Sequence, residues 1–275
     1  MGLKQSRLSS KMLLHLFCLL LLALLFLPQA ATAQQRNLSG FGVVLMHGKG
    51  GQPGGLLTAL AASLEAEGAK VIMPVMAWSG TRGRPTAYDV TYQNSFKAID
   101  AAVAELRRSG VRRVVIAGQS LGANAAIAYA AQKPTGLAGV IALAPGHMPE
   151  RMRQPDIQAA VARARDLVAK GQGGARETWP DLNVGQSFTV TGTAQAYLSF
   201  FDPNGLAVMP RTAARLSSPL LLVVGRSDPL YRLGRGYIFD QAKPHAKSRY
   251  LEINAGHFDT PSQAKDDVVA WLKTL

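Results

Sequence analysis

The sequence predicts an α/β fold in which helices cover both faces of a mostly parallel sheet. Short apolar segments typical of buried strands recur along the chain, and helix-like segments separate most of them. One strand-to-helix junction also carries the pattern G-x-S-x-G. The expected strands are residues 41–46, 70–75, 111–117, 137–143, 219–224 and 248–253.

Apolar residues at helical spacing predict the helices between these strands. The first apolar face is formed by Leu56, Leu57, Leu60 and Leu64 and ends before Gly68, and the second is formed by Phe96, Ile99, Val103 and Leu106 and ends before Gly110. An alanine-rich helix is expected from Leu121 to Ala131. In the last helix, we expect Thr260 as N-cap, Pro261 in the first turn, Gln263 in the reciprocal capping position, and Val268, Val269 and Leu272 on the apolar side.

Residues 147–218 interrupt the alternation of strands and helices. A basic helix-like segment at about 155–170 is followed by a glycine-rich break and then by Tyr197, Phe200 and Phe201. We expect a small cap-like insertion here, between two strands of the sheet. Its aromatic residues are candidates to line a substrate pocket, although such clusters are more often ordinary core.

The N-terminus has the pattern of a secretory signal peptide. Lys4, Arg7 and Lys11 precede an apolar run at residues 12–27, and the small residues 31–33 follow it. We therefore expect cleavage after Ala33, a single α/β domain at residues 34–275, and export to the periplasm or the extracellular medium. The apolar run is too short to be the first choice for a membrane span, so no stable span is expected after cleavage.

Composition restricts the chemistry and the partners. The one cysteine, Cys18, lies in the expected signal peptide, so a cysteine nucleophile is excluded in the mature chain. The formal charge of +13 falls to +10 when the first 33 residues, with three basic and no acidic residues, are removed. Contact with anionic surfaces is compatible with this charge, but a solvated basic surface is favoured because the charges are dispersed. No nucleic-acid-binding signature is present, and no partner of that kind is expected.

The pattern Gly118-Gln119-Ser120-Leu121-Gly122 identifies Ser120 as the candidate nucleophile. It lies between a buried strand and a helix, which is the context in which this pattern holds an exposed serine on a strained turn. Gly118 and Gly122 are expected where a Cβ atom would collide with neighbouring backbone.

A serine hydroxyl needs a base, and histidine is the usual one. His257 directly follows the last strand, so it lies at the same sheet edge as Ser120, and we predict it as the base. His147 is the second choice, His245 belongs at the opposite edge, and His47 is expected to be a structural hydrogen-bonding residue.

An acid must orient this base, and Asp228 is the first choice because it follows the penultimate strand. The order Ser120, Asp228, His257 then matches nucleophile, acid and base. A turn-forming role for Asp228 is the alternative, and Asp259 and Asp202 are the reserve candidates.

Two backbone amides are expected to stabilise an oxyanion. The Leu121 amide lies at the N-terminus of the helix that follows Ser120. The second is assigned to Lys49, with Gly48 or Gly50 as alternatives, because this glycine-rich turn follows the first strand.

These residues make the chain similar to serine hydrolases of the α/β-hydrolase superfamily, esterases and lipases among them. The resemblance covers essentially the whole mature chain and rests on His47-Gly48, the Ser120 motif, Asp228 and His257. It implies a Ser-His-Asp triad at those positions and an acyl-enzyme. The chain departs from many relatives because few residues precede the first strand, so we expect a reduced sheet of about six strands.

The leading hypothesis is hydrolysis of a carboxylic ester, with a small-molecule or lipid-like acyl substrate. Thioester and amide substrates remain open, and neither cofactor nor metal is expected. Trp78, Tyr88 and Tyr92 are candidates to shape the substrate pocket, with core or surface positions equally compatible. The alternative is an exported binding or scaffold protein that keeps this fold without turnover.

Overall fold

The computed structural model describes residues 37–132 and 136–275. The signal peptide expected at residues 1–33 lies outside the described residues and stays a prediction. Residues Asn37–Leu275 form one compact unit. None of the helices in the described ranges is long and apolar enough to cross a membrane.

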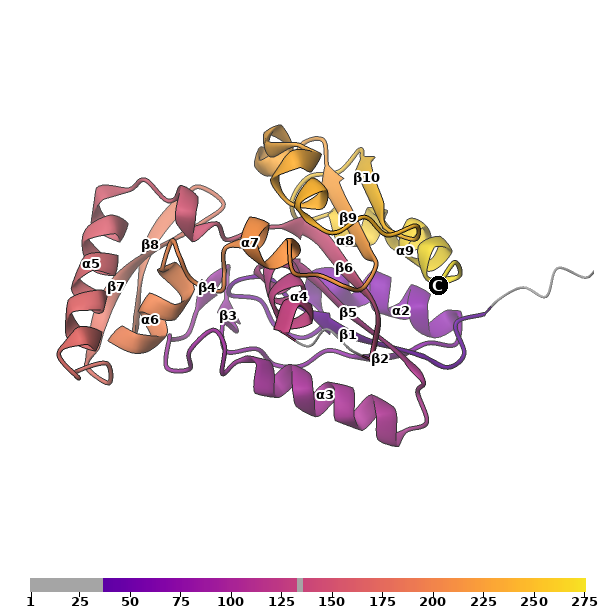
Figure 1. Cartoon of the computed structure of the whole chain (residues 1–275), viewed down its shortest axis with the longest axis horizontal. Coiled ribbons are helices and arrows are strands. Elements are labelled where there is room, and N and C mark those ends of the chain that lie inside the picture. The colour runs from indigo at the N-terminus through magenta and orange to yellow at the C-terminus, as the bar shows by residue number, and fades with distance from the viewer. Residues whose placement is uncertain (1–36, 133–135) are drawn as a thin grey trace, which may run out of the picture. The chain divides into compact units, whose positions relative to one another are not determined.

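The unit is built on a six-stranded parallel sheet with the order β10-β9-β6-β5-β1-β2 (Figure 1). This confirms the expected α/β class and the reduced strand number. The strands are β1 (Phe41–Met46), β2 (Lys70–Ile72), β5 (Arg113–Ser120), β6 (Leu137–Pro145), β9 (Leu220–Gly225) and β10 (Arg249–Ile253).

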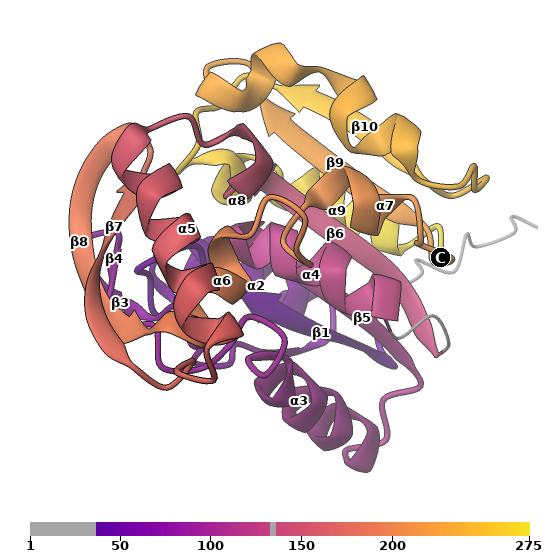
Figure 2. The ribbon, with the colours of Figure 1, turned by 60° about the vertical axis from the view of Figure 1, so that its left-hand side comes forward.

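Alternate residues of each strand point to opposite faces of the sheet, and each face has its own core. Val43 and Val115 pack with one set of helices, whereas their neighbours Val44 and Ile116 pack with the other. The first face is covered by α2 (Thr58–Ala66), α8 (Thr260–Gln263) and α9 (Lys265–Leu272), and the second by α3 (Phe96–Arg108), α4 (Leu121–Gln132) and α7 (Met209–Ala213) (Figures 1 and 2). Burial on both faces explains the uniformly apolar strand sequences.

Two details of the expected elements are wrong. The second strand ends at Ile72 instead of Val75, because Pro74 has no N–H to donate to the sheet. The last helix is divided into α8 and α9, and Thr260 is the first residue of α8 instead of its N-cap. Its hydroxyl donates to the Gly256 carbonyl oxygen at 2.6 Å, four residues earlier, instead of capping the helix amides.

Between β6 and β9 the chain forms a separate layer beside one end of the sheet. This segment contains α5 (Pro155–Ala169), an antiparallel hairpin of β7 (Arg176–Asn183) and β8 (Gln186–Thr193), and α6 (Ala194–Phe201) (Figure 2). The hairpin is paired to the main body through Tyr88, whose N–H and C=O bond to the backbone of Thr191 and Thr193. A smaller hairpin of β3 (Gly80–Thr81) and β4 (Arg84–Pro85) lies in the connection after β2.

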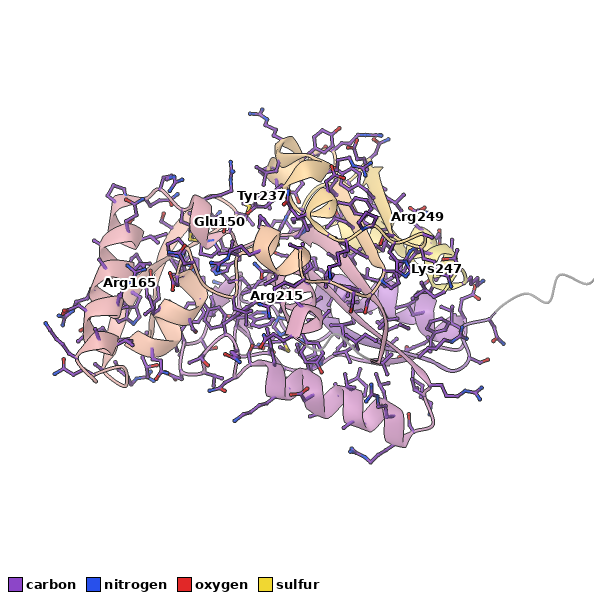
Figure 3. The ribbon with its side chains drawn as sticks, in the orientation of Figure 1. Glu150, Arg165, Arg215, Tyr237, Lys247 and Arg249 are labelled. Carbon is purple, nitrogen blue, oxygen red and sulfur yellow. The ribbon has the colours of Figure 1, made fainter. Side chains whose placement is uncertain are left out.

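Short 3₁₀ segments complete the described structure. They are Gly55–Leu57, Pro149–Arg151, Pro229–Leu233, Arg235–Tyr237 and Phe239–Gln241. Two of them are joined, because the Tyr237 hydroxyl donates a hydrogen bond to the carboxylate of Glu150 (Figure 3). This contact fixes the segment before α5 against the segment that follows β9.

A buried ion pair connects the turn after β1 to the β7–β8 hairpin. Lys49 Nζ lies 2.6 Å from Asp181 Oδ1 and 3.0 Å from the Leu182 carbonyl oxygen. The side chains are 3% and 0% exposed. Asp181 also accepts hydrogen bonds from the Tyr88 hydroxyl and the Leu182 amide. The carboxylate is therefore satisfied on both oxygens, as a buried charge requires.

Removing one partner of this pair is expected to destabilise the fold strongly. Lys49→Met leaves the Asp181 charge buried without its cation, so the free energy of unfolding should fall by about 3–5 kcal/mol in urea titrations. Lys170→Met is the matched control because Lys170 and Asp166 form an exposed pair, and its effect should stay below about 0.5 kcal/mol. A Lys49→Met/Asp181→Asn variant should lose less than Lys49→Met alone, and equal losses would contradict this account.

Candidate active site

Ser120 is the last residue of β5 and has a left-handed backbone conformation, with φ of 55°. Such a conformation costs a residue with a side chain about 1–3 kcal/mol, so its surroundings must enforce it. The chain enters α4 at the next residue, and the Ser120 carbonyl oxygen accepts from the Gly146 amide at 3.1 Å. The sharp turn lifts the serine hydroxyl above the carboxyl edge of the sheet.

The two glycines of the motif permit this turn, as the sequence predicts. A Cβ atom on Gly118 would lie 2.3 Å from the backbone of Gly122. A Cβ atom on Gly122 would lie 2.4 Å from the Met46 carbonyl oxygen, at the end of β1. Both distances are shorter than any tolerated contact, and in both cases the obstacle is backbone that cannot move aside.

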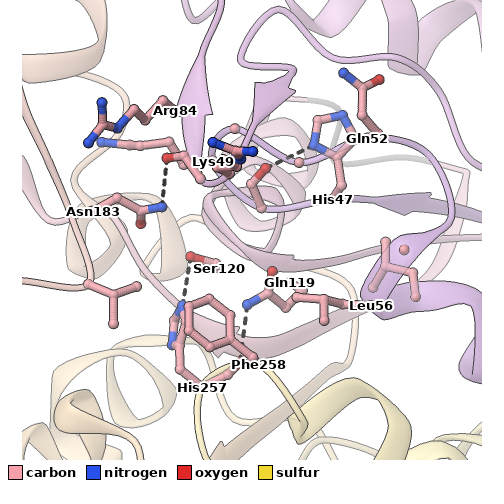
Figure 4. Close-up of a pocket in the computed structure, with 18 of the residues that line it drawn as sticks. His47, Lys49, Gln52, Leu56, Arg84, Gln119, Ser120, Asn183, His257 and Phe258 are labelled. Atoms are coloured by element: carbon pink, nitrogen blue, oxygen red, sulfur yellow. Dashed lines mark hydrogen bonds between the residues drawn. The ribbon is translucent and has the colours of Figure 1, made fainter. Parts of the chain in front are cut away.

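His257 is hydrogen-bonded to Ser120 (Figure 4) and, through its other ring nitrogen, to Asp228. Its Nε2 is 3.0 Å from Ser120 Oγ, and its Nδ1 is 2.7 Å from Asp228 Oδ2. Since a carboxylate only accepts, Nδ1 carries the proton that is donated to Asp228, and Nε2 accepts from the serine hydroxyl. The three residues are 4–8% exposed. The structure thus brings together the three residues that the sequence selects.

Backbone contacts between two loops hold this geometry. The Ser227 amide donates to the Ala255 carbonyl oxygen at 3.0 Å, which joins the loop after β9 to the loop after β10. A Cβ atom on Gly225 would lie 2.3 Å from that same oxygen, so only glycine allows the approach. Asp228 also accepts from the Leu230 amide at 2.8 Å and thereby caps a 3₁₀ turn. Its turn-forming and histidine-orienting contacts coexist, one on each oxygen.

The reserve acids lie elsewhere. Asp259 accepts from the Gly256 amide, and Asp202 pairs with Arg165 on α5. Neither contacts His257.

The other histidines have separate contacts. His47 bonds through Nδ1 to the Gly48 carbonyl oxygen, and its Nε2 lies near the Met76 amide and the Ser79 hydroxyl. Burial lowers its pKa. His147 Nε2 is 2.8 Å from the Phe200 carbonyl oxygen, and burial and the nearby Lys49 charge hold its pKa well below the usual value. Exposed His245 precedes β10.

The residues assigned to the oxyanion hole line one cavity with Ser120 and His257. They are Lys49 and Leu121, from the turn after β1 and the first position of α4. Of the alternatives, the Gly50 amide already donates to the Trp78 carbonyl oxygen at 2.9 Å. No acceptor for the Lys49 amide occurs in the described ranges.

Two cavities meet at Ser120. One, of about 390 Å³, extends over the glycine-rich turn and the β3–β4 hairpin. The other, of about 300 Å³, extends between the segment after β6 and the loop of Asp228. Both are lined by Lys49, Ser120, Asn183, Val184 and His257. A substrate that reaches the serine can therefore extend to either side of it.

Trp78 and Tyr88 do not line either cavity, and this part of the predicted site is wrong. Both are fully buried, as is Tyr92. Tyr88 packs against Phe200 and Phe201 of α6, and Trp78 packs edge-to-face against Phe200. The insertion thus covers these aromatic residues, and the aromatic residues of α6 are core as well.

Two buried polar residues near the site, Gln119 and Asn124, were not predicted from the sequence. Gln119 donates to the carbonyl oxygen of His257 at 3.2 Å. Asn124 donates to the carbonyl oxygens of His147 and Ala207, at 2.7 and 2.8 Å, and accepts from Tyr92. An asparagine within an otherwise apolar, alanine-rich helix was the available signal, since it must find partners when buried.

Comparisons with known proteins agree with this architecture. The family model described as "Alpha/beta hydrolase family" matches residues 43–271. No curated protein sequence is similar enough to match. Among solved structures, one from a study of the metagenome-derived lipolytic enzymes LipS and LipT has a TM-score of 0.60 at 20% identity, over 86% of this chain and 95% of that one.

Two further structures show the same likeness. A monoacylglycerol lipase of Paleococcus ferrophilus has a TM-score of 0.60 at 22% identity, over 85% of this chain and 94% of that chain. A thermophilic esterase of Thermogutta terrifontis has a TM-score of 0.54 at 19% identity, over 86% and 90%. At these identities the likeness concerns the fold, whereas the family model spans most of the sequence. The chain therefore belongs to the alpha/beta hydrolase family.

Proposed function

We propose that the protein is an exported serine hydrolase that cleaves carboxylic esters through Ser120, His257 and Asp228. The observation that carries the proposal is the continuous hydrogen-bonded series from Ser120 Oγ to Asp228, placed where two cavities meet. Lipases and esterases among the structural neighbours favour esters. A thioesterase domain and a proline iminopeptidase share the fold, so thioesters and amides belong in the substrate screen.

In the proposed first step, Ser120 Oγ attacks the carbonyl carbon of the ester while its proton passes to His257 Nε2. The contact of 3.0 Å is already short enough for this transfer. Asp228 keeps the Nδ1 proton in place and stabilises the imidazolium that forms. His257 then returns the proton to the departing alcohol, which leaves the acyl group on Ser120.

In the second step, a water molecule attacks the acyl carbon and gives a proton to His257. Collapse of the second tetrahedral intermediate breaks the bond to Ser120 Oγ, which recovers its proton from His257. The products are an alcohol and a carboxylic acid, and the chain returns to its starting state.

The backbone amides of Leu121 and Lys49 are assigned to stabilise the negatively charged oxygen of both intermediates. Leu121 begins α4, where backbone amides have no helical partner and the helix dipole favours an anion. Removing one such donor typically costs an enzyme about 3 kcal/mol of transition-state stabilisation.

His147 is not suited to replace His257. Its Nε2 is bonded to a backbone carbonyl oxygen, and in the described ranges its buried Nδ1 has no partner. Nor does it contact the Asp228 carboxylate that orients a base.

Ser120→Ala should abolish labelling by a fluorophosphonate and lower the hydrolysis of 4-nitrophenyl esters by at least about 10³-fold, because the attacking atom is removed. His257→Gln should have a comparable effect. The matched control is His245→Gln, which removes an exposed histidine from the opposite edge of the sheet and should retain wild-type labelling.

Equal labelling and turnover in wild type and Ser120→Ala would contradict the assignment. Salt-sensitive binding of an anionic polymer, without any labelling, would instead favour the non-catalytic binding protein.

Stability should decrease on acidification partly through His147. The lowered pKa means that the folded protein keeps this histidine neutral, whereas the unfolded chain binds a proton below about pH 6.5. The contribution is therefore present above that pH and is lost as the pH falls. Unfolding free energies measured between pH 8 and 5 should fall less steeply in His147→Gln, by up to about 1.4 kcal/mol per pH unit. His245→Gln should keep the wild-type slope, and an unchanged slope in His147→Gln would refute this account.

Export can be tested on the native producer. If the signal peptide is cleaved after Ala33, N-terminal sequencing of the protein should begin at Gln34, and the protein should be recovered outside the cytoplasm. Recovery of full-length chain from the cytoplasm alone would contradict the proposal.

A further inference from the structure

The larger of the two cavities at Ser120 is lined by positively charged residues but by no negatively charged ones. Its lining includes Arg82, Arg84 and Lys49, together with the amides of Gln52, Asn183 and Gln186, and it includes no aspartate or glutamate. Lys49 is neutralised by Asp181. The unbalanced positive charge of the cavity therefore comes from Arg82 and Arg84.

Neither of these two arginines is neutralised by a carboxylate of the described residues. Arg163, Arg165, Arg176, Arg226 and Arg235 each pair with a carboxylate. For Arg82 and Arg84, no carboxylate of the described residues lies within ion-pair distance. Two guanidinium groups at the wall of a cavity thus keep their hydrogen-bond donors for a ligand.

The hairpin that carries the arginines is held firmly against the turn after β1. The Gly83 carbonyl oxygen, between the two arginines, accepts from Asn183 Nδ2 at 2.9 Å. A Cβ atom on Gly50 would lie 2.1 Å from the Arg84 amide, so the two turns are in direct backbone contact. The Arg84 guanidinium also lies 5.4 Å from the centre of the Phe188 ring. Figure 4 shows Arg84, Asn183 and Lys49 on one side of Ser120, with His257 and Phe258 on the other.

The second cavity has a different character. Its lining is largely apolar, with Met148, Met152, Leu182, Pro229 and Leu230. It has one arginine, Arg151, whose guanidinium lies 5.6 Å from the centre of the Tyr237 ring, compared with the two arginines of the larger cavity. Its one carboxylate, Asp228, is bonded to His257.

We infer that the substrate is an ester with an apolar group on one side of the scissile bond and an anionic group, a carboxylate or phosphate, on the other. The anionic group binds Arg82 and Arg84, and the apolar group occupies the cavity lined by the two methionines. This inference rests on the proposed function, since the two cavities meet at the serine that would be acylated. It adds that the positive charge of Arg82 and Arg84 selects substrates that carry an anionic group.

Two matched pairs of esters test the inference. In the first, 4-butanoyloxybenzoate and 4-butanoyloxybenzamide differ by one charge on the leaving group. In the second, the 4-nitrophenyl monoester of adipic acid and its ω-amide differ by one charge on the acyl group. We expect kcat/KM of the charged member to exceed that of the amide by about tenfold in one pair, which identifies the side that faces the arginines. The preference should shrink at high salt.

The Arg82→Gln/Arg84→Gln variant should bring the ratio of charged to neutral kcat/KM close to 1. The matched control is Arg163→Gln/Arg165→Gln, which removes the same charge from α5, outside both cavities, and should keep the wild-type ratio. Fluorophosphonate labelling of Ser120 shows that each variant retains a folded site.

The outcomes separate the two proposals. Hydrolysis of all four esters without a charge preference, or a preference that survives in Arg82→Gln/Arg84→Gln, overturns the inference and leaves the ester hydrolase intact. Turnover of none of the four esters above the level of Ser120→Ala overturns both.

Discussion

The left-handed turn at Ser120 is the constraint on which the rest of the site depends. It is unfavourable by about 1–3 kcal/mol on its own, so it persists only because β5, α4 and the end of β1 are packed around it without spare volume. The contacts at Gly118 and Gly122 are backbone to backbone. This close packing fixes the position of Oγ relative to the sheet, and the base and oxyanion donors of the proposed mechanism must then be brought to that position from elsewhere in the chain.

The parallel arrangement of the strands brings these groups to the position of Ser120. Because all six strands of the main sheet run the same way, the segments that follow β1, β5, β9 and β10 emerge at one edge. Lys49, Ser120, Asp228 and His257 are far apart in sequence, yet each follows or ends a strand. That is why the fold and the hydrogen-bonded series could be predicted from local patterns: apolar periodicity located the strands, and position after a strand located the residues.

Features that depend on contacts between distant segments could not be predicted in this way. Trp78 and Tyr88 lie in an irregular connection, and nothing in their local sequence indicates that α6 covers them. Thr260 has the sequence context of an N-cap, but its hydroxyl is bonded to the carbonyl oxygen four residues earlier. The pairing of Lys49 with Asp181 could not be predicted from local sequence either, because the two residues are 132 positions apart.

That pairing determines the electrostatics of the site. A lysine that lines the same cavities as Ser120 could contribute its ammonium group to the proposed oxyanion hole. Here Nζ is bonded to Asp181 and to the Leu182 carbonyl oxygen, so its charge is balanced within the insertion, and only its backbone amide remains for the oxyanion. The insertion therefore has two electrostatic consequences. It neutralises Lys49, which lines both cavities, and it leaves Arg82 and Arg84 as the source of the field that an anionic substrate would meet on entering the larger cavity.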